Sequence, residues 1–173
     1  MQPTTVTLDD GRTVRLRNRR RDDAEALYEM YSSMSKDTQR WTMSPITRER
    51  IERWLSQEEQ VFAIVATSDD RIVGHSAFFM HDYPRLKGIA DLGIQIHQDF
   101  QGVGLGTAMT EICIREAKES ELHRLSLEVV AENEAAIHLY DKLGFVKEGL
   151  KRDAFFGQDG KYHDLVVMGQ ILD

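Results

Sequence analysis

Three glycines, Gly102, Gly104 and Gly106, lie within the short segment Gln101–Gly106. An alternating run typical of a strand precedes the segment, and a helical pattern follows it. Glycine lets another molecule approach the backbone closely, and the first turn of a helix offers unpaired amide groups and the positive end of its dipole. The spacing therefore indicates either a loop that binds a phosphate or pyrophosphate, or an ordinary turn from strand to helix.

Two well-known nucleotide-binding motifs fit this loop poorly. A nucleoside triphosphate loop requires a lysine directly after its last glycine, but the first lysine after Gly106 is Lys118. A dinucleotide loop requires Gly-x-Gly-x-x-Gly, whereas this loop reads Gly-x-Gly-x-Gly. Glu128 has the spacing of a ribose-binding acid, but Val129 and Val130 continue the strand beyond it. The first motif is excluded and the second is disfavoured.

The elements that position this loop follow from hydrophobic periodicity and turn residues. We expect two strands joined at Asp10–Gly11, helices that begin near Asp22 and at Thr47, and an irregular stretch over 34–46. Asn133 is the expected N-cap of a later helix, and Gly144 follows its end. Further strands are expected over 60–67, 71–80, 88–97 and 124–130, with two final strands joined around 158–160. This order predicts a mixed sheet with helices on both faces.

The length of 173 residues and the 41% hydrophobic content predict a single domain over 1–173. Cys113 is the only cysteine and lies in an apolar helical series, so we interpret it as a core residue. The six histidines have no metal-binding spacing, and we expect no metal.

The bulk properties also exclude some partners. No window approaches the length of a membrane span, and the first residues lack the pattern of a signal peptide, so we expect a cytoplasmic protein without a membrane partner. The net charge of −7 argues against a nucleic-acid partner, although six arginines lie between Arg12 and Arg21.

The loop and a segment downstream of it resemble the GNAT superfamily, the acetyl-CoA-dependent N-acetyltransferases. Gln101, Gly104 and Gly106 occupy the defined positions of the family's loop, Gln/Arg-x-x-Gly-x-Gly/Ala. The family's second signature, Asn-x-x-Ala-x-x-x-Tyr-x-Lys-x-Gly-Phe, is matched at Asn133, Ala136, Tyr140, Lys142, Gly144 and Phe145. The two matches occur in order, and the resemblance covers at least residues 61–149.

The resemblance implies an α/β (α+β) fold, with a mixed, mostly antiparallel central sheet of about seven strands that splay at the site of coenzyme A. Acetyl-CoA would be a co-substrate. Backbone amides of the loop would bind its pyrophosphate, and its pantetheine arm would pair with the strand that carries Ile94 and Ile96. Asn133 would contact the same arm, although its role as an N-cap explains it equally well. The cofactor residues implied are Ile94, Ile96, Gln101, Gly102, Val103, Gly104, Leu105, Gly106, Thr107 and Asn133.

The reaction implied is direct attack of a neutral primary amine on the thioester through a tetrahedral intermediate. Tyr140 matches a family tyrosine that protonates the leaving sulfur, and core packing is the alternative role. Glu128 is the first candidate for the general base and Asp91 the second, although either can be a solvated strand carboxylate.

The resemblance favours a small-molecule acceptor, namely an amino acid, a diamine or a polyamine. A peptide N-terminus, or a sensor that binds coenzyme A without catalysis, are the alternatives. Acceptor binding is expected from residues 28–46 and 154–164, where Phe155, Phe156 and Tyr162 are candidates or pack against the second helix. We also expect a homodimer, because the apolar final strand can pair across a two-fold axis, unless it is covered internally.

Overall fold

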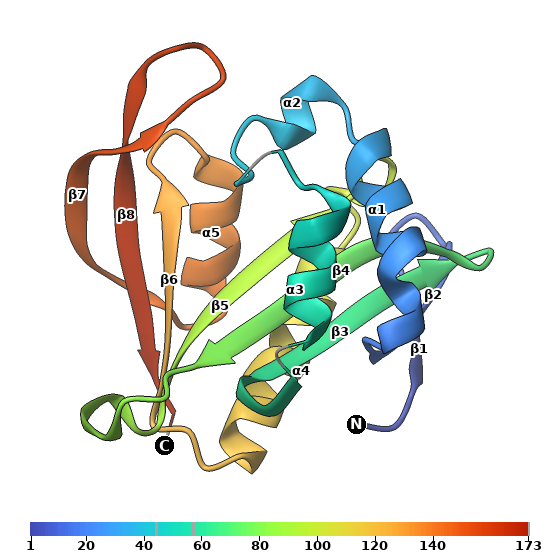
Figure 1. Ribbon diagram of the computed structural model, residues 1–173, viewed down its shortest axis with the longest axis horizontal. Coiled ribbons are helices and arrows are strands. Elements are labelled where there is room, and N and C mark those ends of the chain that lie inside the picture. Colours follow the sequence, from blue (N-terminus) through green and yellow to red (C-terminus); the bar gives the residue numbers. More distant parts are fainter. Residues whose placement is uncertain (44, 57, 173) are drawn as a thin grey trace.

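The computed structural model describes residues 1–43, 45–56 and 58–172 (Figure 1). One sheet contains all eight described strands, in the order β1-β2-β3-β4-β5-β6-β8-β7. The strands are β1 (Thr4–Thr7), β2 (Thr13–Asn18), β3 (Val61–Ser68), β4 (Arg71–Met80), β5 (Ile89–Ile96), β6 (Arg124–Val130), β7 (Val146–Phe156) and β8 (Tyr162–Ile171). The α-helices are α1 (Ala24–Ser33), α2 (Lys36–Gln39), α3 (Arg48–Ser56), α4 (Leu105–Glu119) and α5 (Glu134–Lys142). Short 3-10 helices span Arg21–Asp23, Glu58–Gln60, Pro84–Leu86 and Gln98–Phe100.

The sheet divides between β5 and β6. Every other neighbouring pair is antiparallel, whereas β5 and β6 run parallel and pair only over Ile89–Asp91 and Arg124–Ser126. Beyond Asp91 the two strands diverge into a V, with α5 beside the opening (Figure 1). The splayed, mostly antiparallel sheet expected from the sequence is therefore confirmed.

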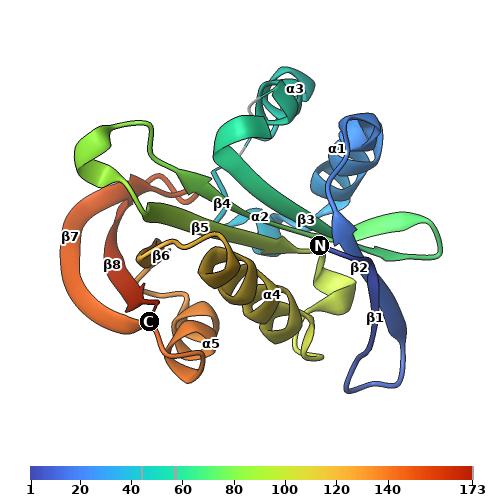
Figure 2. The ribbon, with the colours of Figure 1, turned by 90° about the horizontal axis from the view of Figure 1, so that it is seen from below.

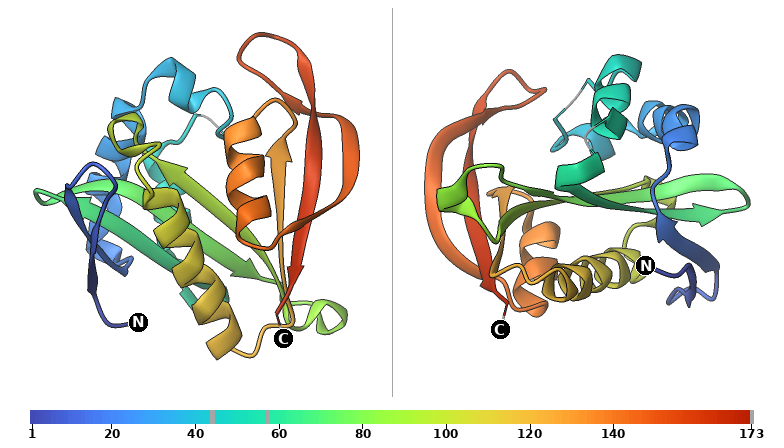
Figure 3. Two further views of the ribbon diagram at one scale, coloured as in Figure 1. Left: turned by 180° about the vertical axis from the view of Figure 1, so that it is seen from behind. Right: turned by 60° about the horizontal axis from the view of Figure 1, so that its bottom comes forward.

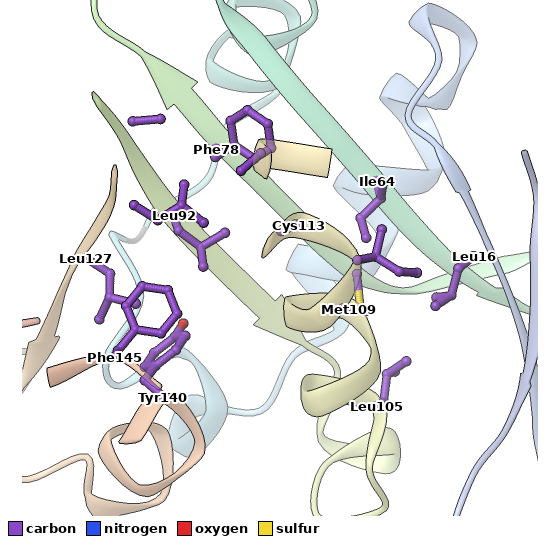
Figure 4. Close-up of a cluster of buried hydrophobic side chains, with 14 of the residues drawn as sticks. Leu16, Ile64, Phe78, Leu92, Leu105, Met109, Cys113, Leu127, Tyr140 and Phe145 are labelled. Atoms are coloured by element: carbon purple, nitrogen blue, oxygen red, sulfur yellow. The ribbon is translucent and has the colours of Figure 1, made fainter. Parts of the chain in front are cut away.

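Helices cover both faces of the sheet, as expected: α1 and α3 lie on one face, and α4 and α5 on the other (Figure 2). The larger core lies under α4 and α5 and contains Leu105, Met109, Cys113 and Phe145 (Figure 4). Cys113 is fully buried, and burial raises the pKa of its thiol to about 12. The prediction that it is a core residue is confirmed. A smaller core under α1 and α3 is centred on Leu27, Met30 and Ile51.

The predicted helix ends are confirmed by their hydrogen bonds. The hydroxyl of Thr47 accepts from the amide of Arg50 at 3.3 Å before α3, and Asn133 Oδ1 accepts from the amide of Ala136 at 3.3 Å before α5. Gly144 follows α5 with a φ of +91°, a conformation that L side chains rarely adopt.

Three features refine the expectation. The sheet has eight described strands, which is the number read from the sequence, N-terminal hairpin included, where the resemblance implies about seven. Residues 34–46 are not wholly irregular, since they include α2. The final strand, β8, lies between β6 and β7, so β7 is the outer strand on this side of the sheet.

Within the arginine-rich segment Arg12–Arg21, Arg17 makes a bidentate ion pair with Asp23 at 2.7 and 2.8 Å.

Candidate functional site

A cavity of about 510 Å³ lies beside the diverging part of β5. Its walls come from the end of β5, from the glycine loop and first turn of α4, and from the start of α5. Figure 3 shows α4 and α5 side by side on this face. We call this space the cofactor cavity, after the expectation from the sequence.

Most of the predicted cofactor residues meet at this cavity. Eight of the ten line it: Ile94, Ile96, Gln101, Gly102, Gly104, Gly106, Thr107 and Asn133. The other two face elsewhere, since Leu105 is fully buried in the core and Val103 packs against that core. Their side chains therefore anchor the loop and do not line the cavity.

Glycine occurs at the three positions for different structural reasons. Gly102 and Gly104 have φ angles of +70° and +87°, so their backbone conformation requires glycine. Gly106 has an ordinary φ, but a Cβ there would lie 3.2 Å from Leu139 Cδ2 and 3.3 Å from Ile96 Cδ1, two residues of the cavity wall. Gly106 is therefore the glycine that keeps the cavity open.

The start of α4 can receive an anion. Gly104 is the N-cap and has no side chain to bond the first amides of the helix. The first hydrogen bond of the α4 ladder runs from the amide of Ala108 to the carbonyl of Gly104 at 3.1 Å. The amides of the preceding turn and the helix dipole thus face the loop region with a partial positive charge.

The N-terminal hairpin braces this loop from outside the cavity. The amide of Asp9 donates to the carbonyl of Val103 at 3.0 Å, and Arg12 donates to the carbonyl of Asp99 at 2.6 Å. The guanidinium of Arg12 also lies 4.0 Å from the centre of the Phe100 ring. The hairpin therefore restrains the loop whose amides face the cavity.

Sequence reasoning missed the α2 segment, residues 35–41, which supplies the remaining wall. Arg40 and Trp41 both line the cavity, and the Arg40 guanidinium lies 4.5 Å from the centre of the Trp41 ring. Ser35 caps α2 by accepting from the amide of Thr38 at 3.1 Å. That N-cap serine, followed closely by an arginine and a tryptophan, was the only local signal.

A second cavity, of about 200 Å³, lies on the face of the sheet covered by α1 and α3. Tyr31 of α1 and Trp54 of α3 line it, together with His75 of β4. Ile94 and Gln95 of β5 line both cavities, so the two spaces meet at these residues. We call this second space the α1/α3 cavity.

His75 lies in the wall of the α1/α3 cavity, and each of its ring nitrogens has a polar partner. Its Nδ1 lies 2.9 Å from the Tyr31 hydroxyl, and its Nε2 lies 3.3 Å from Nη1 of Arg19. Burial, aided by the charge of Arg19, lowers the pKa of His75 to about 3. Burial also raises the pKa of Tyr31. Both side chains are therefore neutral near pH 7.

Tyr140 lies on α5 and is 5% exposed. Its ring meets that of Phe145 edge-on, with centres 5.5 Å apart, and its hydroxyl oxygen points away from α5 (Figure 4). Burial raises the pKa of the phenol, which keeps it protonated at neutral pH. Tyr140 does not belong to the described lining of either cavity.

The two candidate bases lie on one face of the sheet. Asp91 pairs in register with Ser126, and Glu128 follows two positions later, so both carboxylates point to the face of α1 and α3. Asp91 lies 3.1 Å from Nε2 of His81, and Glu128 forms an ion pair with Lys151. Both are exposed, at the narrow end of the V, and neither belongs to the described lining of a cavity.

The aromatic residues expected at the acceptor lie apart from the described lining of the α1/α3 cavity. Phe155 contacts Trp41 edge-on, with ring centres 6.3 Å apart. Phe156 and Tyr162 are exposed and contact one another, with ring centres 5.1 Å apart.

Within the described ranges, no group of three or more histidine, cysteine, aspartate or glutamate side chains could hold a metal ion. No described helix has the length and apolar character needed to cross a membrane.

Residues 24–145 match the model of the acetyltransferase (GNAT) family. The chain is similar to a mycothiol acetyltransferase of Rhodococcus jostii, with 30% identity over 109 residues that cover 61% of this chain and 35% of that protein. It is 39% identical over 75 residues to the [ribosomal protein bS18]-alanine N-acetyltransferase of Escherichia coli, covering 43% of this chain and 50% of that protein. It is 28% identical over 121 residues to an L-amino acid N-acetyltransferase of Escherichia coli, covering 68% of this chain and 72% of that protein.

Among solved structures, the fold is similar to that of a GNAT-family acetyltransferase from Streptococcus pneumoniae. The TM-score is 0.83 and the identity 28%, over 92% of this chain and 99% of that chain. The chain spans only between 33% and 50% of the length of the first curated relatives.

His163 contributes to the contact between the α2 segment and the β7–β8 hairpin. Its Nδ1 lies 2.9 Å from Glu132 Oε1, its Nε2 lies 3.0 Å from Asp159 Oδ1, and its ring centre lies 5.1 Å from that of Trp41. Hydrogen bonds that the ring donates to Glu132 and then to Asp159 raise the pKa of His163. Protonated His163 therefore stabilises the folded state fully below its unfolded pKa of about 6.5, and this contribution is lost as pH rises through the raised folded pKa.

We expect His163→Gln to lower the melting temperature most near pH 6 and progressively less at higher pH. Thermal unfolding of both proteins from pH 5.5 to 9 measures the difference. His138→Gln, at an exposed position of α5, is the control for the effect of the substitution itself. A difference for His163→Gln that grows with pH would contradict the expected charge state.

Proposed function

Since the chain belongs to the acetyltransferase (GNAT) family, we propose that it transfers the acetyl group of acetyl-CoA to the primary amine of a small molecule. One observation carries the proposal: the cofactor cavity, beside the diverging part of β5, and the α1/α3 cavity meet at Ile94 and Gln95. A donor and an acceptor bound in the two cavities would bring their reacting groups together there, which removes much of the entropic cost of a bimolecular reaction.

The residues of the cofactor cavity fit acetyl-CoA. The amides at the start of α4 suit a pyrophosphate, and Arg40 is the one cationic side chain of the described lining, which also includes Asp37. The edge of β5 that faces β6 has no strand partner beyond Asp91 among the described residues, so its backbone can pair with an extended amide-containing arm. Acetyl-CoA supplies the activated acyl group, as a thioester.

Tyr140 is proposed as the residue that holds a proton for the leaving sulfur. Its buried phenol stays protonated near pH 7. It also lies one residue after Leu139, a wall residue of the cofactor cavity. The packing against Phe145 fixes the ring without engaging the hydroxyl.

Glu128 is proposed as the general base that accepts the proton of the amine, directly or through water. Asp91 is the second candidate for this role. Both point to the face of the α1/α3 cavity, from which the amine would enter. His75, which is closer to that cavity, is a poor candidate because its lowered pKa makes it a weak base and both ring nitrogens are engaged.

A small-molecule acceptor is supported by the modest volume of the α1/α3 cavity, about 200 Å³. The similarity to an L-amino acid N-acetyltransferase is compatible with it. The similarity to a ribosomal-protein alanine acetyltransferase favours the second candidate, a peptide N-terminus, whose first residue alone would enter the cavity. Retention of Tyr140 argues against a sensor without catalysis, which needs no phenol near the sulfur.

The proposal includes a cytoplasmic homodimer. Exposed Val146 and Leu150 on β7 support a contact there. Simple strand addition is disfavoured, because two irregularities interrupt the register of β7 with β8. Light scattering that gives the monomer mass of 19.9 kDa would contradict the dimer.

We expect Gly106→Val, a residue larger than the glycine or alanine of the family's loop, to weaken acetyl-CoA binding by at least about tenfold, or about 1.4 kcal/mol. The added isopropyl group would press on Ile96 and Leu139 and narrow the cofactor cavity. The fold should persist, because valine is no less favourable than glycine in a helix. Calorimetric titration with acetyl-CoA and chemical denaturation measure the two effects.

Gly149→Val is the matched control, because a Cβ there meets open space on β7, away from the described lining of both cavities. It should leave acetyl-CoA affinity unchanged. Gly104 is a poorer probe, since any side chain at its φ of +87° strains the loop itself. Unchanged affinity in Gly106→Val would mean that acetyl-CoA does not use this cavity.

We expect Tyr140→Phe to lower kcat by roughly 100-fold while acetyl-CoA affinity and the fold persist, because only the proton donor is removed.

Glu128→Gln should lower the rate chiefly at neutral pH, and its rate should recover as pH approaches the pKa of the amine, about 10. Rates of thiol release from pH 6 to 10, with an accepted amine, measure both. Asp91→Asn should lower the rate less than Glu128→Gln does.

Full kcat in Tyr140→Phe at every pH would reduce the phenol to a packing role. A pH-dependent loss in Asp91→Asn instead of Glu128→Gln would exchange the roles assigned to the two carboxylates.

A further inference from the structure

The described lining of the α1/α3 cavity contains no side chain that is charged near pH 7. Its walls are largely aromatic or aliphatic, from Tyr31, Met43, Ile46, Trp54, Ala77 and Phe79. Polar side-chain groups of the described lining come from Thr42, His75, Gln95, the Tyr31 hydroxyl and the Trp54 indole N–H. The nearby carboxylate of Asp91 lies outside this lining and is engaged by His81 at 3.1 Å.

The hydrogen bonds of His75 define which groups can donate into the cavity. Arg19 can only donate, so its contact at 3.3 Å requires that Nε2 of His75 carries a lone pair. The neutral ring therefore carries its proton on Nδ1 and donates it to the Tyr31 oxygen at 2.9 Å. The hydroxyl proton of Tyr31 then remains available for an uncharged acceptor group of a bound molecule.

We propose that the α1/α3 cavity holds the body of the acceptor. It selects a monoamine whose body is uncharged and mainly apolar over diamines and polyamines. This inference rests on the proposed acetyl transfer and narrows its acceptor. The amine itself would lie where the cavity meets Ile94 and Gln95, and its apolar body would extend between Trp54, Ile46 and Phe79.

A second ammonium inside the cavity would be costly for two reasons. It would lose its hydration without a carboxylate partner in the described lining. The guanidinium of Arg19, which lies 3.3 Å from Nε2 of the wall residue His75, would add repulsion. An alkyl or aromatic group in the same place gains from burial.

The cavity volume suggests a probe of suitable size. About 200 Å³ gives room for roughly seven groups of the size of water, at ~30 Å³ each. Hexylamine and 1,5-diaminopentane each have about that many non-hydrogen atoms, and they differ only in a terminal methyl group against a terminal ammonium. They therefore isolate the effect of the second charge.

The experiment measures kcat/KM for thiol release from acetyl-CoA with each amine. We expect hexylamine to exceed 1,5-diaminopentane by at least about 100-fold in the parent protein. Ile46→Asp places a carboxylate in the wall and should reduce or reverse this preference. Ile46→Asn, of the same size but uncharged, should weaken hexylamine without improving the diamine.

A binding measurement gives a second readout that does not need turnover. The chain has two tryptophans, Trp41 at the cofactor cavity and Trp54 at the α1/α3 cavity. In Trp41→Phe, hexylamine should change the fluorescence of Trp54 in a saturable way, and 1,5-diaminopentane should do so only at much higher concentration.

Equal or better use of the diamine by the parent, or the same preference in Ile46→Asp as in the parent, would overturn the inference while acetyl transfer stands. If acetyl-CoA binds but no amine in a broad panel releases thiol, both the proposed function and this inference are wrong.

Discussion

The short parallel contact between β5 and β6 is the constraint on which the rest of the site depends. Each of these strands is held along its whole length by an outer neighbour, β5 by β4 and β6 by β8. The pair can therefore separate beyond Asp91 without unfolding either half of the sheet. Separation leaves polar backbone groups of β5 without a strand partner, and the Gln101 side chain satisfies one of them by donating to the Ile96 carbonyl at 2.9 Å.

The glycine pattern illustrates how one motif can combine separate physical requirements. Gly102 and Gly104 are required by backbone geometry, which any tight loop before a helix could demand. Gly106 is in the helix, where glycine is unfavourable, and its place is explained by the space between Ile96 and Leu139. Gly106 therefore meets a packing requirement at the wall of the cofactor cavity, whereas Gly102 and Gly104 meet a requirement of the loop backbone.

Much of the fold could be predicted because its elements are locally encoded. The helix ends at Thr47, Asn133 and Gly144 depend on side-chain caps and on one positive φ, all readable from the sequence. The α2 segment could not be predicted in the same way, because four residues carry no hydrophobic period. Its position depends instead on distant partners, such as Gln98, whose Oε1 accepts from the amide of Ser35 at 3.0 Å.

The acceptor side is only partly readable from the sequence, for a related reason. The described lining of the α1/α3 cavity includes Tyr31, Met43 and Ile46 from the expected stretch 28–46, but none of the candidate aromatics of residues 154–164. That lining comes from five separate stretches of the chain, around Tyr31, Met43, Trp54, His75 and Gly93. Only tertiary packing brings such stretches together, whereas most of the cofactor cavity lies within residues 94–107 and 133–139, to which the α2 segment adds the remaining wall.

The alternation of side chains along β5 separates two kinds of evolutionary change. Ile96 belongs to the described lining of the cofactor cavity alone and Gly93 to that of the α1/α3 cavity alone, whereas Ile94 and Gln95 border both. Under the proposed function, substitution at Gly93 can remodel the acceptor side while Ile96 keeps its place beside the donor. A gene duplicate of such a protein could thus drift toward a new acceptor through changes at residues that the two cavities do not share, whereas a change at Ile94 or Gln95 would alter both halves of the reaction.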